Sequence, residues 1–267
     1  MVLVSARMRR LVAAVPLAVA ACAPSPVEWS EGRTLTFGSP AMALSPGGAL
    51  VTDSMNLAAA SVTPPVSACA GSLRLARSVG NTLAVWWSPR ADSSARLLFA
   101  YSTDGGTTWG SVVPVDTSDR GVSGCRRAPP AITADAASGY VHVTYGMVAP
   151  EGPGLFFSHS MDGGVLFHAP VPILYGERLG HTSVAAAGDL VAVAFEDPNS
   201  ATPRIGLALS RTMGHIFEDR ILPVSDDNGT ATHPLVALQG RRMTVAWRQR
   251  TAANGSVVLR VRSGTLH

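Results

Sequence analysis

The feature that most constrains the fold is a unit of about 50 residues that recurs along the chain. An eight-residue phrase that opens on serine and ends on an aromatic residue appears three times, as STDGGTTW (102–109), SMDGGVLF (160–167) and SRTMGHIF (210–217). Similarity at a nearly fixed period of this length is typical of folds built from repeated supersecondary units. We therefore expect one repeated architecture over most of the chain.

Short strands recur in phase with this phrase. Four alternating segments end on an aromatic residue: LAVWW (83–87), VHVTY (141–145), VAVAF (191–195) and MTVAW (243–247). Another short strand precedes each of them, at 72–76, 130–134, 182–186 and 234–238, and a further one follows the phrase, at 112–115, 170–173 and 221–224. Four short strands in each unit predict an all-β propeller of four-stranded blades, whose core forms where blades stack on one another.

The ends of the repeat predict how the ring is closed. Four units are explicit, and residues 37–70 are expected to form a shortened fifth blade; rings of four or six blades are the alternatives. The last unit stops at RSGTLH, before its outer strand. The N-terminal segment EWSEGRTLTF (28–37) is expected to supply that strand, which completes the last blade and hides two sheet edges.

The N-terminus predicts export. The basic segment RMRR (7–10) precedes an apolar run (11–21) that is too short to span a bilayer, and VAAC, which ends at Cys22, resembles a bacterial lipobox. We expect a signal peptide at 1–21, lipidation of Cys22, a short linker at 22–28 and a propeller domain at 29–267. The expected location is the bacterial cell envelope through this lipid anchor, or a secreted or periplasmic one if the lipobox is not used.

Composition excludes several classes of function. The 21 basic residues are all arginine, which excludes lysine Schiff-base chemistry and any phosphate-binding P-loop. Three of these arginines lie in the first ten residues, and the remaining 18 balance the 18 acidic residues. Nucleic-acid binding requires a basic patch, so we expect no nucleic-acid partner.

Export also bears on the other two cysteines. Cys69 and Cys125 would face an oxidising compartment, where a disulfide between them is one expectation. Two buried free thiols are the alternative.

The phrase S-x-D-x-G-x-x-W is the Asp box, and with it the chain resembles the sialidase-like, BNR-repeat propellers. In that family the box braces a turn on the face away from the ligand: the aspartate accepts backbone N–H groups, and glycine supplies a positive φ. The third copy has Thr212 in the place of the aspartate. The resemblance gives structural roles to Ser102, Asp104, Gly106, Trp109, Ser160, Asp162, Gly164 and Phe167.

The same resemblance bears on activity. Sialidases begin their first blade with F-R-I-P, whose arginine joins two others to clamp the substrate carboxylate. Here Phe37 and Pro40 are in place, Gly38 stands where the arginine belongs, and no arginine lies between Arg33 and Arg74. Whether the chain is an enzyme is left open. We expect a non-catalytic surface lipoprotein that binds a glycan or an envelope protein, the alternative being an exo-glycosidase with a rearranged active site.

In each blade, the loop before the innermost strand and the loop after the second strand lie on the same face of the propeller. A ligand is expected on that face. The residues of these loops suit a glycan or carboxylate pocket because they offer guanidinium groups, carboxylates and a tyrosine. The catalytic candidates are Tyr175, Glu177, Glu196 and Asp53. The ligand-binding candidates are Arg126, Arg127, Arg178, His181, Asp197, His233 and Arg248. We expect a monomer with no metal and no cofactor.

Overall fold

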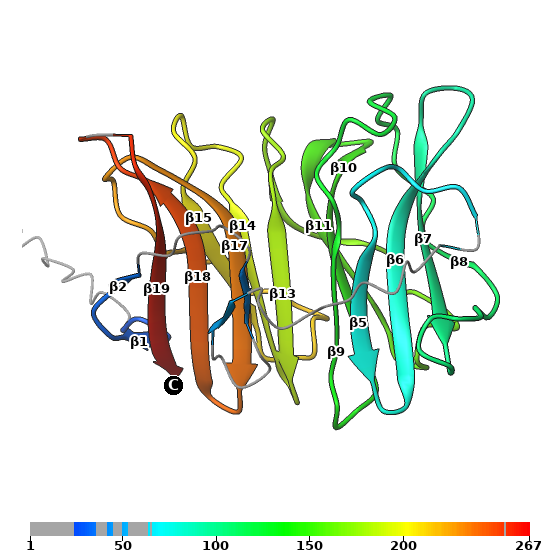
Figure 1. Cartoon of the computed structure of the whole chain (residues 1–267), viewed down its shortest axis with the longest axis horizontal. Coiled ribbons are helices and arrows are strands. Elements are labelled where there is room, and N and C mark those ends of the chain that lie inside the picture. The colour runs from blue at the N-terminus through cyan, green and yellow to red at the C-terminus, as the bar shows by residue number, and fades with distance from the viewer. Residues whose placement is uncertain (1–23, 36–41, 45–49, 53–63, 65, 254) are drawn as a thin grey trace, which may run out of the picture.

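The computed structural model describes residues 24–35, 42–44, 50–52, 64, 66–253 and 255–267. Within these ranges the regular secondary structure is entirely β-strand, which confirms the all-β class. Four antiparallel sheets stand side by side as the blades of a propeller (Figure 1). No helix that could span a membrane occurs in the part of the chain that is described.

Within each blade the strands are named here in their order from the centre of the propeller outward. Blade I holds β5 (Arg74–Ser78), β6 (Asn81–Pro89), β7 (Ala95–Ser102) and β8 (Val113–Asp116). Blade II holds β9 (Ala131–Ala134), β10 (Val141–Ala149), β11 (Gly152–Ser160) and β12 (Val171–Tyr175). Blade III holds β13 (Thr182–Ala187), β14 (Leu190–Glu196), β15 (Ile205–Ser210) and β16 (Leu222–Pro223). Blade IV holds β17 (Thr230–Gln239), β18 (Arg242–Arg250), β19 (Val257–Leu266) and the N-terminal β1 (Val27–Trp29) and β2 (Arg33–Leu35).

The predicted strands are present, with two shifts at the innermost strands. β5 begins at Arg74 rather than at residue 72, because the Ser72 hydroxyl bonds the Cys69 carbonyl and accepts the Trp87 amide instead of joining a ladder. β17 begins four residues earlier than predicted, because residues 230–232 pair with 248–250 before the register shifts.

The N-terminal strand completes the last blade as predicted. β1 pairs with β19 in the register Val27 to Leu266 and Trp29 to Gly264, and β2 pairs further along the same strand. Figure 1 shows β1 and β2 beside β19, the strand next to the C-terminus. The side chain of Val27 is buried against blades III and IV. Residues from the two ends of the chain therefore complete one blade and cover the edge of β19.

A two-stranded sheet lies in the region of the expected fifth blade. β3 (Met42–Leu44) and β4 (Leu50–Thr52) pair antiparallel, and β3 contacts β17 of blade IV. The innermost strands β5, β9, β13 and β17 contact one another in that order. Residues 53–63 and 65 of that expected blade fall outside the described residues.

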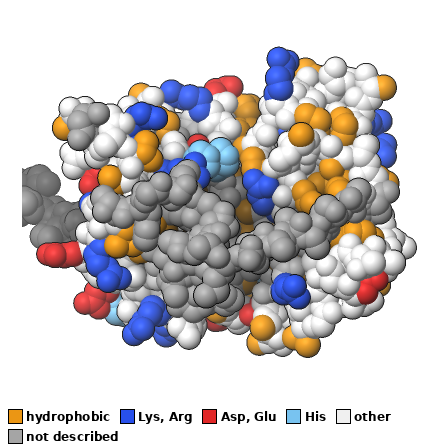
Figure 2. All heavy atoms as spheres, viewed as in Figure 1, with side chains coloured by type: hydrophobic (Ala, Val, Ile, Leu, Met, Phe, Trp, Pro, Cys, Tyr) orange, Lys and Arg blue, Asp and Glu red, His pale blue; other side chains and the backbone are white. Residues whose placement is uncertain are grey.

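The core consists of side chains packed between blades. The aromatic residues that end the second strands, Trp87, Tyr145, Phe195 and Trp247, are all at least 98% buried. Trp87 and Tyr145, from neighbouring blades, meet edge to face with ring centroids 6.1 Å apart. At the surface, positive and negative side chains are interspersed over the face that Figure 2 shows, as the balanced composition predicts.

The Asp-box turns brace the connections between third and fourth strands. Asp104 accepts the Thr108 amide at 2.8 Å, and the Ser102 hydroxyl accepts the Gly106 amide at 2.7 Å. Asp162 and Ser160 make the equivalent bonds in blade II. In the degenerate third copy the Thr212 hydroxyl accepts the Ile216 amide at 2.9 Å, so threonine takes over the role of aspartate.

The aromatic residue of each later box joins two blades. Phe167 of blade II packs edge to face on Phe99 of blade I, with ring centroids 5.2 Å apart. Phe217 of blade III packs in the same way on Phe157 of blade II, at 5.0 Å. A Cβ atom on Gly164 would overlap the Phe99 ring, so the glycine is required by packing as well as by its φ of 102°.

A disulfide joins Cys69 to Cys125, with Cα atoms 5.2 Å apart. Cys69 precedes β5 and Cys125 follows β8, so the covalent loop contains the whole of blade I. Cys69 is buried and Cys125 is exposed. Of the two alternatives that the sequence left open, the structure has the disulfide.

Candidate functional site

Three loop segments meet at the end of the propeller opposite the Asp-box turns. They are residues 175–181, 196–204 and 226–233. The Asn199 side chain donates to the Tyr175 carbonyl at 2.8 Å, and the Ala231 amide donates to the Pro203 carbonyl at 2.9 Å. These bonds tie blades II, III and IV together on the face where the repeat predicts a ligand.

Glu196 is the centre of a side-chain cluster on this face. One of its carboxylate oxygens, Oε1, accepts the His233 backbone amide at 2.8 Å and lies 3.1 Å from Nδ1 of His181. The rings of His181 and His233 stack, with centroids 3.9 Å apart and planes 27° from parallel. The glutamate side chain is 14% exposed, whereas the histidine side chains are 37% and 44% exposed. A largely buried carboxylate thus lies beside two imidazole rings that solvent can reach.

The backbone places these three residues together. Glu196 ends β14, and its amide donates to the His181 carbonyl. His233 has a φ of 54° at the irregularity within β17, an uncommon conformation for a residue other than glycine, and this directs its amide at Glu196. A Cβ atom on Gly180 would overlap the Glu196 carboxylate, so only glycine fits beside it.

Burial and neighbouring groups set the charges of Glu196 and His233. Burial opposes ionisation of Glu196, but the hydrogen bonds from His181 and the His233 amide outweigh burial and hold its pKa below the ordinary value. Burial, together with the charges of His181 and Arg248, lowers the pKa of His233. At neutral pH the site therefore presents an ionised carboxylate and a neutral imidazole, with the Arg248 guanidinium in the same electrostatic environment.

The remaining candidates in these loops have other contacts. The Tyr175 ring packs on Phe156 with centroids 5.8 Å apart, and Arg178 donates to the Ala201 carbonyl. Asp197 accepts the Asn199 amide within its own turn, and Glu177 is exposed. The structure thus brings together His181, Glu196 and His233, whereas Tyr175 and Arg178 make their contacts elsewhere.

Arg127 has a structural environment in the loop between blades I and II. Its guanidinium pairs with buried Asp119, donates to the carbonyls of Gly124 and Gly121, and lies 4.5 Å from the centroid of the Trp87 ring. These contacts hold the loop that also carries the disulfide. Arg126 is exposed beside it. Asp53, Gly38 and Cys22 lie outside the described residues.

Gly180 and Asp119 also shape these loops, but the sequence pattern did not identify either of them as a candidate. Both lie within the loops that the repeat assigns to the ligand face. Their roles depend on spatial neighbours, the Glu196 carboxylate for Gly180 and Arg127 for Asp119, so residue spacing alone does not reveal them.

The cluster also contains metal-ligand atom types. One such atom from each of His181, Glu196 and His233 lies within 4.8 Å of the others. Oxygen Oε1 of Glu196, however, already accepts the His233 amide and faces His181. That oxygen is therefore already engaged in hydrogen bonds, and hydrogen-bonded recognition is the chemistry that this arrangement supports directly.

No protein-family model matches the chain, and no curated protein matches it. Among solved structures, a protein of unknown function from Dyadobacter fermentans matches with a TM-score of 0.53 and 15% identity, over 71% of this chain and 51% of its own. The chain thus spans about half the length of that protein.

Glycoside hydrolases also occur among the similar structures. One is described as xyloglucan PUL GH43B of Bacteroides ovatus, with a TM-score of 0.46 and 11% identity over 75% of this chain and 40% of its own. Another is a family 117 glycoside hydrolase of Zobellia galactanivorans, with a TM-score of 0.42 and 12% identity over 72% of this chain and 60% of its own.

Proposed function

We propose that the chain is an exported propeller that binds a glycan, without cleaving it, through the cluster of His181, Glu196 and His233. The observation that carries the proposal is the ionised Glu196 carboxylate, held by two hydrogen bonds beside two accessible imidazole rings. An anchored carboxylate accepts hydrogen bonds from sugar hydroxyls, and flat rings cover the apolar faces of a sugar. A glycan offers both hydroxyl groups and apolar faces, so it suits the carboxylate and the rings together.

The charge state of Glu196 argues against its acting as the general acid of a glycosidase. A glycosidase general acid must carry its proton at the working pH, and such residues have a raised pKa. The pKa of Glu196 is held below its ordinary value, which opposes that role. In the sialidases that the chain resembles, the nucleophile is a tyrosine paired with a glutamate. Here the ring of Tyr175, the candidate for that role, packs on Phe156.

Export and anchoring are part of the proposal. The signal-like residues 1–21 and lipidation of Cys22 would place the propeller at the bacterial cell envelope, where glycans are abundant ligands. A disulfide between Cys69 and Cys125 supports an oxidising compartment. An envelope protein remains the alternative ligand for the same face.

The test is a glycan array probed with the wild-type chain and with Glu196→Gln. Glutamine keeps the shape of the side chain but removes the charge, so binding of any glycan retained by the wild type should weaken by at least about tenfold. Glu218→Gln is the matched control, because Glu218 is also ion-paired, with Arg211 at 2.9 Å, but follows the Asp box of blade III on the opposite face.

The outcomes separate the hypotheses. Binding that is lost in Glu196→Gln and retained in Glu218→Gln supports the proposed site. Equal binding by all three proteins would place the ligand elsewhere on the molecule. No binding to any glycan would reject glycan recognition and favour an envelope protein as ligand.

A further inference from the structure

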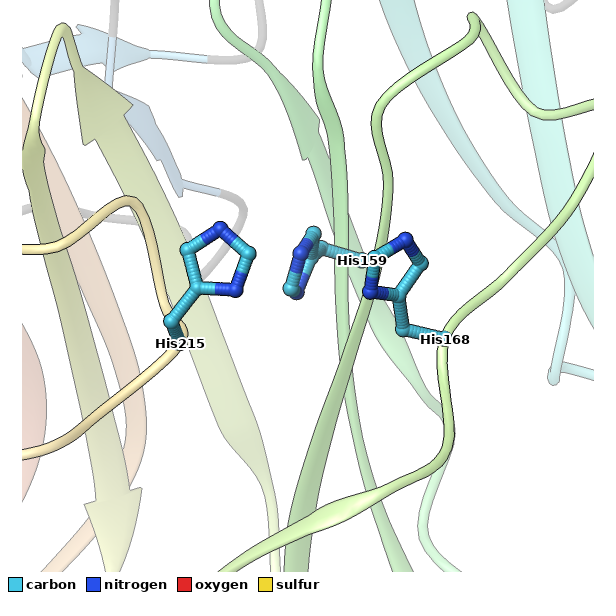
Figure 3. A group of neighbouring side chains, drawn as sticks. All are labelled: His159, His168 and His215. Carbon is cyan, nitrogen blue, oxygen red and sulfur yellow. The ribbon is translucent and has the colours of Figure 1, made fainter.

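A second cluster of titratable side chains lies far from this site, on the Asp-box face between blades II and III. It consists of His159, His168 and His215 and is called here the three-histidine cluster. The ring centroid of His159 lies 4.5 Å from those of both His168 and His215, which are 6.2 Å apart (Figure 3). Figure 3 shows the His159 ring between the other two, with the three side chains converging from separate segments. One ring nitrogen from each histidine lies within 4.8 Å of the others.

The backbone of the cluster is fixed by the braced turns. The His168 amide donates to the His159 carbonyl at 2.9 Å, and the Ser158 hydroxyl donates to the His168 carbonyl at 2.7 Å. His215 lies within the third Asp box, where its amide donates to the Thr212 carbonyl at 3.0 Å. The three rings are therefore presented by rigid segments of two adjacent blades, a property that a built site requires.

His159 lacks a partner for one of its ring nitrogens. Its side chain is on β11, the residue is only 2% exposed, and Nε2 is buried without a hydrogen-bond partner among the described residues. Burying a polar atom without a partner costs free energy, so such atoms are uncommon and call for an explanation. A bound cation would supply the missing partner.

The protonation state of His159 suits a metal ion. Burial, together with the charges of His215 and His168, lowers the pKa of His159 to about 4, so its ring is neutral at neutral pH and keeps a free lone pair. His168 and His215 are exposed, so an ion can reach the cluster from solvent. The ring of Tyr140 is nearly parallel to that of His159, with centroids 6.3 Å apart, and forms part of the cluster's wall.

The ligand types select the class of ion. Three imidazole nitrogens without a carboxylate suit Zn²⁺ and related first-row transition metals, whereas Ca²⁺ and Mg²⁺ prefer oxygen ligands. In a tetrahedral zinc site, metal–nitrogen distances of about 2.0–2.1 Å place the ligand nitrogens roughly 3.3 Å apart. Binding would require the exposed His168 and His215 side chains to rotate until the nitrogens reach this spacing.

We propose that His159, His168 and His215 bind one Zn²⁺ ion between blades II and III, with the fourth coordination position open to solvent. The ion would link the two blades on the face opposite the candidate glycan site. No sequence spacing indicates the cluster, because its members lie on a strand, in a turn and in the next blade. The proposal is independent of the glycan-binding proposal, since the two sites share no residue.

The test is isothermal titration of ZnCl₂ into the chain, purified without a polyhistidine tag and stripped with EDTA. The expected result is uptake of one Zn²⁺ per chain, lost or weakened at least tenfold in His168→Gln and in His215→Gln. Both side chains are exposed, so these variants should keep the melting temperature of the metal-free wild type. His181→Gln is the matched control, because it removes one histidine from the other cluster.

Thermal melting gives a second readout. Zinc at about 100 times its dissociation constant should raise the melting temperature of the wild type by about 5 °C or more, but not that of His168→Gln or His215→Gln. Calcium and magnesium should have no such effect. No zinc uptake, equal uptake in wild type and both variants, or loss of uptake in His181→Gln alone would overturn the proposal and leave a metal-free histidine cluster.

Discussion

Replacing both Cys69 and Cys125 by alanine should lower the free energy of unfolding by about 4 kcal/mol. The disulfide spans a sequence separation of 56 residues and encloses all of blade I. In the chain-entropy model, closing a loop of that length removes about 14 cal/mol/K from the unfolded chain, which is about 4 kcal/mol at 25 °C. Because a domain is stable by only about 5–15 kcal/mol, this loss would be a large fraction of the total.

Urea denaturation of the wild type and of the double variant, each with and without reductant, measures the difference. Reductant should lower the midpoint of the wild type nearly to that of the variant and leave the variant unchanged. The exposed position of Cys125 gives the reductant access. A difference below about 1 kcal/mol, or recovery of both cysteines as free thiols from the exported protein, would refute the argument.

Two further predictions concern the contacts between blades. Burial raises the pKa of Asp135, but hydrogen bonds, one of them from the Gly188 amide of the next blade, outweigh it and hold the pKa below 3.8. The stabilisation by the ionised form is therefore present above pH 3.8 and is lost as pH falls through the folded-state pKa. Asp135→Asn should cost about 2 kcal/mol at pH 7 and less at pH 3, as measured by denaturation at both pH values; a cost independent of pH would contradict this. Gly164→Ala should cost about 3 kcal/mol, because its Cβ would overlap Phe99, whereas Gly139→Ala, with open space around it, should cost about 1 kcal/mol; equal costs in thermal melts would contradict the packing argument.

Much of the fold could be predicted because the repeat fixes the position of each strand within its blade. Each blade needs an aromatic residue such as Trp87 or Tyr145 at the end of its second strand, since that side chain fills the space between blades. The absence of an outer strand after β19 likewise predicted that the N-terminal strand completes the last blade, because an uncovered strand edge is unfavourable.

The sites were predicted less completely. Loop positions relative to the repeat pointed to His181, Glu196 and His233, but not to their convergence on one carboxylate oxygen. That convergence depends on a positive φ at His233, which no local sequence pattern specifies. The three-histidine cluster was missed because its residues meet only through blade packing and through the exact course of two braced turns.

The most direct test of the central claim, that the face around Glu196 binds without catalysing, is hydrolysis of a fluorogenic sialoside and a panel of other fluorogenic glycosides. The chain from residue 23 is compared with Glu196→Gln under identical conditions. If the face only binds, the wild type should show no turnover above the level given by the variant. Turnover by the wild type that is abolished in Glu196→Gln would contradict the account and make the cluster an active site.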